Sequence, residues 1–113
     1  LIGATAAYGL YIATLEALQQ ADFEAYLQKA AQLLAATRPT AVDLFYAIQK
    51  SMQAIAAEPD RAAKPLAALS AAQDFASESL ESCRRIGEFG LDIIKKISAR
   101  KGGAPVNVLT HCN

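Results

Sequence analysis

The sequence predicts a mainly α fold, in which a helical domain ends in a single strand. Hydrophobic residues make up 53% of the 113 residues, but many of them are alanine and only 7% of the chain is aromatic. Such a composition favours helices that pack closely through small side chains. Apolar residues also recur at steps of three and four through most of the chain, which is the period of an amphipathic helix. The pattern changes only after the Gly-Gly-Ala-Pro segment at 102–105, where β-branched residues follow.

The first predicted helix covers about residues 3–20. Its large apolar side chains fall on one face, the predicted core face, formed by Tyr8, Tyr11, Ile12, Leu15 and Leu18. A strip of small residues at its start lets another backbone approach closely, and this strip consists of Gly3, Ala6 and Ala7. The helix is therefore expected to pack against neighbours.

Short polar residues and prolines mark the next two helices. Asp22 is the predicted N-cap of the second helix, which must end near Arg38 because Pro39 cannot continue it. Thr40 is predicted to cap the third helix, with Asp43 in the place of the usual Glu of a capping box. The predicted core face of this third helix consists of Val42, Phe45, Ile48, Met52 and Ile55.

The Glu-Pro-Asp break at 58–60 separates the third helix from a long fourth one over about 62–101, where Pro65 is tolerable only in the first turn. The late apolar stripe of this helix consists of Ile86, Phe89, Ile93 and Ile97. Gly87 and Gly90 lie inside it, at a cost of about 1 kcal/mol each relative to alanine. Two such costs in one turn predict a close backbone contact.

The last segment reads as a buried strand. A run rich in β-branched residues begins after Pro105 and delivers Cys112 to its carboxyl end. In α/β proteins that edge is where ligands bind and chemistry is done. Because a domain rarely ends on its own core strand, we expect the chain to be a piece of a larger protein.

Charge and cysteine content narrow the classes of partner. Eleven basic residues balance eleven acidic ones, so neither nucleic acid nor an anionic membrane surface is expected as the main partner. No stretch of about 20 apolar residues lacks charges, so no transmembrane helix is expected. Cys83 and Cys112 lie far apart and nothing signals secretion, which favours a reducing cytoplasm without a disulfide. His111 and Cys112 are adjacent, a poor geometry for sharing a metal, so no metal site is predicted.

Four short motifs, each weak alone, occur together in the order and spacing of one family. They are GATAAYG at 3–9, TRPTAV at 37–42, IGEFG at 86–90 and THCN at 110–113. On these motifs essentially the whole chain resembles the amino-terminal part of the methylthioribose-1-phosphate isomerase family, aldose–ketose isomerases of methionine salvage. Its close relatives are isomerases of ribose 1,5-bisphosphate and deoxyribose 1-phosphate, and regulatory subunits of translation initiation factor 2B.

The resemblance implies a helical domain over 1–103 and, over 104–113, the first strand of a Rossmann-like α/β domain that otherwise lies outside this chain. It implies an enzyme that converts methylthioribose 1-phosphate to methylthioribulose 1-phosphate, without a cofactor or metal, as a cytoplasmic homodimer. A catalytic aspartate of the family lies in the absent domain. We therefore expect this fragment alone to be inactive.

Residue roles also follow from the resemblance. Cys112 matches the family's catalytic cysteine, which transfers a proton, and Arg38 matches an arginine that binds the substrate phosphate. Gly3 and Asn113 are candidate residues of the substrate pocket. The sequence departs from the family at Asp43, where the isomerases usually have Asn, and its charge would weaken phosphate binding if it pointed inward.

Simpler readings stay open beside these roles. Most free cysteines are buried structural thiols, which is the alternative for Cys112. Arg38 could be a solvated cation at a helix end, although a loop just before a helix start is where N–H groups and a guanidinium hold phosphate best. For the whole protein, the alternative is a non-catalytic regulatory or assembly module, as in the initiation-factor relatives, which generally lack the cysteine of THCN.

Overall fold

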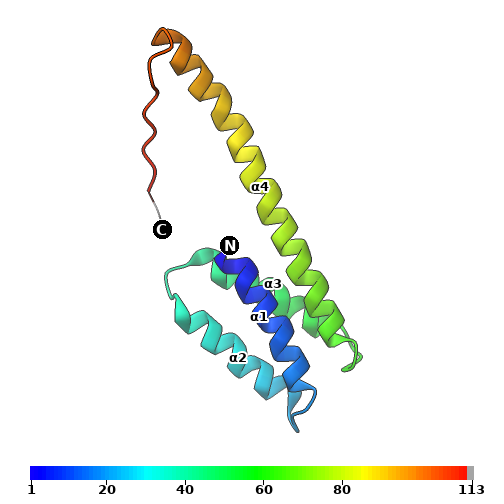
Figure 1. The fold of residues 1–113 in the computed structure, drawn as a ribbon. Helices are drawn as coiled ribbons and strands as arrows, with labels where there is room; N and C mark the ends of the chain where they lie inside the picture. Colours follow the sequence, from blue (N-terminus) through cyan, green and yellow to red (C-terminus); the bar gives the residue numbers. More distant parts are fainter. Residues whose placement is uncertain (112–113) are drawn as a thin grey trace. The chain divides into compact units, whose positions relative to one another are not determined.

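The computed structural model describes residues 1–111, and that part of the chain contains four helices and no strand. The predicted mainly α fold is confirmed (Figure 1). The chain divides into two compact units, Leu1–Ser79 and Leu80–Asn113. Helix α4, Lys64–Arg100, begins in the first unit and continues into the second.

Helix α1, Ile2–Ala17, packs against both α2, Phe23–Thr37, and α3, Val42–Ala57. Its buried residues are mostly small: Gly3, Ala6, Ala7, Leu10, Ala13, Thr14 and Ala17. The predicted core face is wrong for Tyr8, Ile12 and Leu15, which are 37%, 54% and 43% exposed. It is right for Tyr11 and Leu18, which are half-buried and pack against the core. Small residues let two neighbouring helices approach α1 closely, so the alanine side of the helix faces the core.

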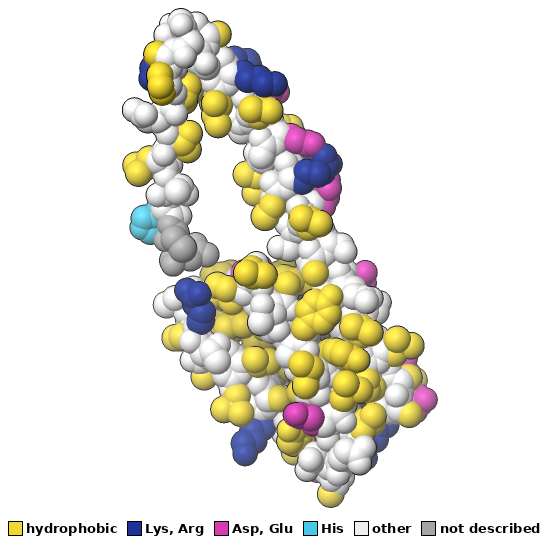
Figure 2. Space-filling model, viewed as in Figure 1, with side chains coloured by type: hydrophobic (Ala, Val, Ile, Leu, Met, Phe, Trp, Pro, Cys, Tyr) yellow, Lys and Arg dark blue, Asp and Glu magenta, His cyan; other side chains and the backbone are white. Residues whose placement is uncertain are grey.

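Helices α2 and α3 supply the larger core side chains, including Phe23, Leu27, Leu44, Ile48 and Ile55. The predicted core face of α3 is therefore right for Ile48 and Ile55. It is wrong for Val42 and Phe45, which are exposed. Hydrophobic side chains also cover part of the visible outer surface of this unit (Figure 2).

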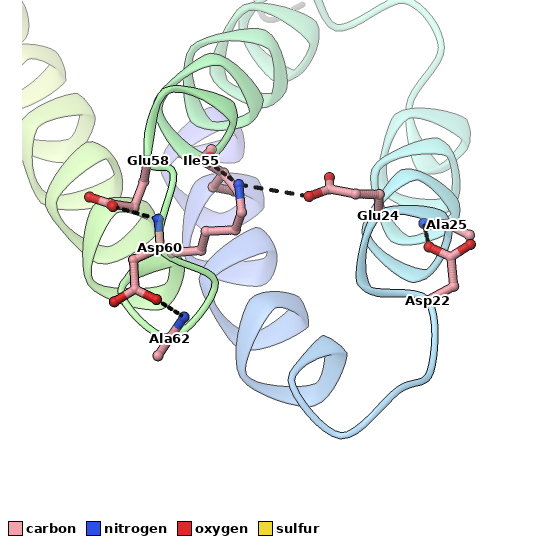
Figure 3. Close-up of polar contacts among 8 residues, drawn as sticks. Asp22, Glu24, Ala25, Ile55, Glu58, Asp60 and Ala62 are labelled. Carbon is pink, nitrogen blue, oxygen red and sulfur yellow. Dashed lines mark hydrogen bonds and ion pairs between the residues drawn. The ribbon is translucent and has the colours of Figure 1, made fainter.

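The starts of α2 and α3 differ in how they are capped. The Asp22 carboxylate accepts a hydrogen bond from the Ala25 N–H at 2.9 Å, so the predicted N-cap is confirmed (Figure 3). The predicted Thr40 cap is wrong, since the N-cap of α3 is Ala41 and it makes no side-chain capping bond. The amides of Leu44 and Phe45 bond to the Ala41 carbonyl, which leaves Thr40 one residue outside the capping position.

Two cations bind carbonyls at the carboxyl-terminal ends of helices. Lys64 Nζ donates to the Ile55 carbonyl at 2.8 Å and lies 3.7 Å from the Glu24 carboxylate (Figure 3). Arg61 donates to the Gln20 carbonyl, just beyond α1, at 2.7 Å. Positive charge is favourable there because the helix dipole is negative at its carboxyl end. The Lys64 side chain is buried for this reason although it is charged.

The second unit contains the rest of α4. Arg84 donates to Glu81 at 2.7 Å and also pairs with Glu88. Three residues of the predicted late stripe are exposed, with Ile86 at 68%, Phe89 at 69% and Ile93 at 61%, and Ile97 is half-buried. The predicted close backbone contact is wrong for the described part of the chain, where no atom lies within 4 Å of a Cβ built at Gly87 or Gly90.

Helix α4 ends at the predicted glycine pair. Gly102 and Gly103 have φ of 62° and 86°, the left-handed region that a glycine adopts without strain. The Gly103 N–H donates to the Ser98 carbonyl and the Gly102 N–H to the Ala99 carbonyl, which is the Schellman pattern of a helix end. Residues 104–111 form no regular element. A strand needs a neighbour to complete its hydrogen bonds, so the predicted strand and the domain boundary at 103/104 stay predictions.

Candidate functional site

Arg38 lies in the short connection between α2 and α3. Helix α2 ends at Thr37, and Arg38 leaves it with φ of −146° and ψ of 80°, outside the α region that a following proline disfavours. The side chain is exposed, and within residues 1–111 no ion pair involves its guanidinium. The planar fork is therefore free to bind an anion, and a phosphate matches its geometry.

Asp43 connects the start of α3 to the start of α1. Its Oδ2 accepts a hydrogen bond from the Gly3 N–H at 2.9 Å. A Cβ at Gly3 would lie 2.6 Å from this oxygen and 2.8 Å from a ring carbon of Phe75. Gly3, a candidate pocket residue, is thus buried against Asp43 and Phe75, where only glycine allows so close an approach.

The start of α1, the end of α2 and the start of α3 lie together, and we call this region the Arg38 end (Figure 1). Asp43 acts there as a cap, as expected, but for α1 rather than for its own helix. Its negative charge lies at two helix starts, whose dipoles favour it. A phosphate at the Arg38 end would be attracted by the guanidinium and repelled by this carboxylate.

An open pocket of about 250 Å³ also lies at the Arg38 end. Its lining comes from all three helix ends and consists of Leu1, Ile2, Thr5, Ala6, Leu34, Thr37 and Leu44. The only polar side chains in this set are two threonines, and both hydroxyls already donate to backbone carbonyls. Thr5 donates to the Leu1 carbonyl at 3.0 Å, and Thr37 to the Leu34 carbonyl at 2.6 Å. This pocket is not apparent from the sequence, because its lining residues come from segments far apart in the chain.

The remaining predicted site residues lie at the end of the given sequence. Cys112 and Asn113 lie outside the described residues, and their assignments stay predictions. His111 is exposed. Over residues 1–111, no group of three or more His, Cys, Asp and Glu side chains is arranged to hold a metal ion. In the same range no helix combines the length and the apolar character needed to cross a membrane.

Comparison with known proteins gives a match over the entire chain. The sequence profile described as the Initiation factor 2 subunit family matches residues 1–113. A methylthioribose-1-phosphate isomerase of Desulfosudis oleivorans is 43% identical over 100% of this chain and 31% of its own length. One of Methylorubrum populi is 47% identical over 100% of this chain and 29% of its length.

A further relative carries a different substrate in its name. The 5-deoxyribose 1-phosphate isomerase of Moorella thermoacetica is 44% identical over 99% of this chain and 31% of its own length. The chain thus spans about 30% of the length of these curated relatives. No solved structure matches it.

Proposed function

The chain belongs to the initiation factor 2 subunit family, and from this membership we infer that the longer protein it is part of, its parent, is an aldose–ketose isomerase of sugar phosphates. The observation that carries the proposal is the match of the whole chain to relatives named as sugar-phosphate isomerases. We propose methylthioribose 1-phosphate as the substrate and methylthioribulose 1-phosphate as the product. The parent would act in methionine salvage.

The proposed reaction moves one hydrogen from C2 to C1 of the sugar. The C2 hydroxyl loses a proton as C2 becomes a carbonyl, and the ring oxygen gains a proton as the ring opens, so the composition is unchanged. Such a reaction needs an acid and a base with pKa values near neutrality, held on opposite sides of the substrate. The protein must also hold the phosphate while the sugar rearranges.

Arg38 is the residue that we assign to the phosphate. Its guanidinium is exposed and, among the described residues, engaged in no ion pair. It directly precedes Pro39 and the start of α3, where free N–H groups add to the attraction of an anion. The nearby Asp43 carboxylate is held by the Gly3 N–H, which directs it toward α1. These features support a phosphate site of moderate affinity.

Cys112 is the residue that we assign to proton transfer, with an acidic residue of the absent part as its partner. The free thiol has a pKa of about 8.5, close enough to neutrality for a modest change of surroundings to make it an acid or a base. The support for this assignment is the THCN motif. We further propose that the parent is a cytoplasmic homodimer with neither nucleic acid nor membrane as a partner.

The test uses the purified parent and methylthioribose 1-phosphate. Cys112→Ser should lower kcat by about 100- to 10,000-fold, because it removes a proton-transferring group. Arg38→Ala should mainly raise KM, by about 10- to 100-fold, because it removes a charged contact made in both ground and transition states. Cys83→Ser and Arg85→Ala are the matched controls and should leave both constants unchanged. Equal effects of Cys112→Ser and Cys83→Ser would refute the catalytic assignment.

A non-catalytic regulatory or assembly module is the second candidate, favoured by the name of the matching family. The same experiment separates the two. A parent that is inert on methylthioribose 1-phosphate but turns over ribose 1,5-bisphosphate or deoxyribose 1-phosphate would be an isomerase with another substrate. A parent that is inert on all three would be the regulatory module.

A further inference from the structure

We propose that Phe23, Arg61 and Lys64 act as one unit, the Phe23 clasp, which ties the start of α4 to the other three helices. The clasp lies where α1 ends, α2 begins and α3 ends, at the opposite end of these helices from the Arg38 end (Figure 1). The inference concerns how α4 is held in the first unit and does not depend on the proposed isomerase function.

The centre of the clasp is the ring of Phe23, the first residue of α2. Arg61 Cζ lies over this ring at 5.5 Å from its centroid, and Lys64 Nζ lies over it at 5.9 Å. A cation within about 6 Å of a ring centroid is attracted by the ring, and the attraction is stronger where water is excluded. Phe23 is 5% exposed and Lys64 is 8% exposed. Two cations thus share one buried ring.

Each cation also binds the end of a different helix. Arg61 donates to the Gln20 carbonyl just beyond α1 at 2.7 Å. Lys64 Nζ donates to the Ile55 carbonyl of α3 at 2.8 Å and lies 3.7 Å from the carboxylate of Glu24, in the first turn of α2 (Figure 3). The two cations repel each other, and the negative ends of two helix dipoles together with this carboxylate offset the repulsion. The clasp therefore joins the ends of three helices.

The connection between α3 and α4 holds both cations in one turn. The Glu58 carboxylate accepts a hydrogen bond from the Asp60 N–H at 3.0 Å, and the Asp60 carboxylate accepts one from the Ala62 N–H at 3.0 Å (Figure 3). The Asp60 carbonyl accepts a hydrogen bond from the Lys64 N–H at 3.1 Å. Because Arg61 and Lys64 extend from a turn that is braced by its own hydrogen bonds, a displacement of one cation also moves the other.

Energetic coupling distinguishes the clasp from two separate contacts. Cations that only neutralised the carbonyls at their own helix ends would stabilise the unit independently of the Phe23 ring. Cations that share the ring lose part of their effect when the ring is removed. Lys64 is the first residue of α4, and α4 continues into the second unit. The clasp thus fixes the beginning of the helix that connects the two units.

Native-state hydrogen exchange of the purified parent tests the coupling, because it reports the equilibrium constant for opening of one unit without unfolding of the whole protein. The probes are the amides of Leu10 and Ala13, which are buried in the middle of α1. Phe23→Leu removes the ring but keeps an apolar side chain. The factor by which Lys64→Met or Arg61→Met raises the opening constant should be about three to ten times smaller in the Phe23→Leu background than in the wild type.

Tyr46 and Lys50 provide the matched control. Lys50 Nζ lies 5.5 Å from the centroid of the Tyr46 ring, about as far as the clasp cations lie from theirs, but Tyr46 is 51% exposed. Attraction between a cation and a ring is weaker in water. Tyr46→Leu should therefore change the effect of Lys50→Met less than Phe23→Leu changes the effect of Lys64→Met.

If Phe23→Leu fails to fold, Arg61→Met and Lys64→Met give a second test with the ring in place. The double variant should raise the opening constant about threefold less than the product of the two single effects, since the loss of one cation already frees the ring and the turn. Cation effects that are equal with and without the ring would overturn the inference. In the second test, single effects that multiply fully in the double variant would overturn it.

Discussion

Gly3→Ala should destabilise the first unit, whereas Gly9→Ala, in the same helix, should stabilise it. Both substitutions add one methyl group to α1, so they differ only in what that methyl group meets. At Gly3 the new Cβ would lie 2.6 Å from Asp43 Oδ2 and 2.8 Å from the Asp43 backbone oxygen. At Gly9 its nearest neighbours would be the two methyl groups of Leu34, at 3.4 and 3.5 Å.

The contacts set the expected magnitudes. Overpacking at Gly3 costs about 1–3 kcal/mol, and displacement of Asp43 weakens a charged hydrogen bond worth about 1.5–3 kcal/mol. The higher helix propensity of alanine returns about 1 kcal/mol. We therefore expect Gly3→Ala to lower the free energy of unfolding by about 1.5–5 kcal/mol. At Gly9 the higher helix propensity of alanine is the only expected effect, so Gly9→Ala should raise the free energy of unfolding by about 0.5–1 kcal/mol.

Urea unfolding followed by far-ultraviolet circular dichroism measures both values, provided that the dependence on urea is the same in each variant. Asp43→Ala in the Gly3→Ala background serves as a further control. It removes the carboxylate from the clash but leaves the Asp43 backbone oxygen and Phe75 in place, so it should restore little stability. Equal stability of Gly3→Ala and Gly9→Ala would refute the reasoning.

Three further predictions concern other parts of the chain. Lys64→Met should lower the free energy of unfolding by about 1–3 kcal/mol, because it leaves the Ile55 carbonyl of α3 without its hydrogen-bond donor. Lys50→Met is the control: it removes a solvent-exposed ion pair and should change the urea midpoint little. The hydrogen bond from Arg84 holds the pKa of Glu81 below its ordinary value. At pH values above the ordinary carboxyl pKa the ionised pair therefore stabilises the helix fully, and this stabilisation is lost as the pH falls through the lowered pKa of Glu81. Helix content measured by circular dichroism should therefore be lower in Glu81→Gln than in the wild type at neutral pH and equal in strong acid. Gly87→Ala should raise helix content, as its Cβ meets no described atom within 4 Å, and a loss of helix would contradict that.

Helix positions were predictable from the sequence because their signals are local. Asp22 caps the turn that it begins, Pro39 ends the preceding helix, and Gly102 adopts the left-handed conformation that ends α4. Such signals act over a few residues and do not depend on tertiary structure. The side of α1 that faces the core was not predictable in this way. The large residues pointed to one side, but the approach of two helices favoured the alanines.

At the candidate site, too, features with a local sequence signal were predictable and features that depend on tertiary structure were not. The sequence placed Arg38 just before a helix start, which the structure bears out, whereas its binding of phosphate stays a prediction. The partner of Asp43 could not be predicted, since Gly3 lies 40 residues away in the sequence. The pocket depends on three helix ends meeting, and no sequence period encodes that. Roles for Cys112 and Asn113 rest on the motif alone.

The contacts at the two ends of α1 have a consequence for how this helix opens. The Gly3 N–H is bonded to Asp43 at one end, and the Gln20 carbonyl beyond the other end is bonded to Arg61, across 40 and 41 residues of sequence. Most helices exchange their terminal amide hydrogens rapidly because the ends fray locally. In α1 fraying at the first turn must break a contact with α3. The Gly3 amide hydrogen should therefore exchange with solvent about as slowly as amides in the middle of the helix, by opening of the whole unit.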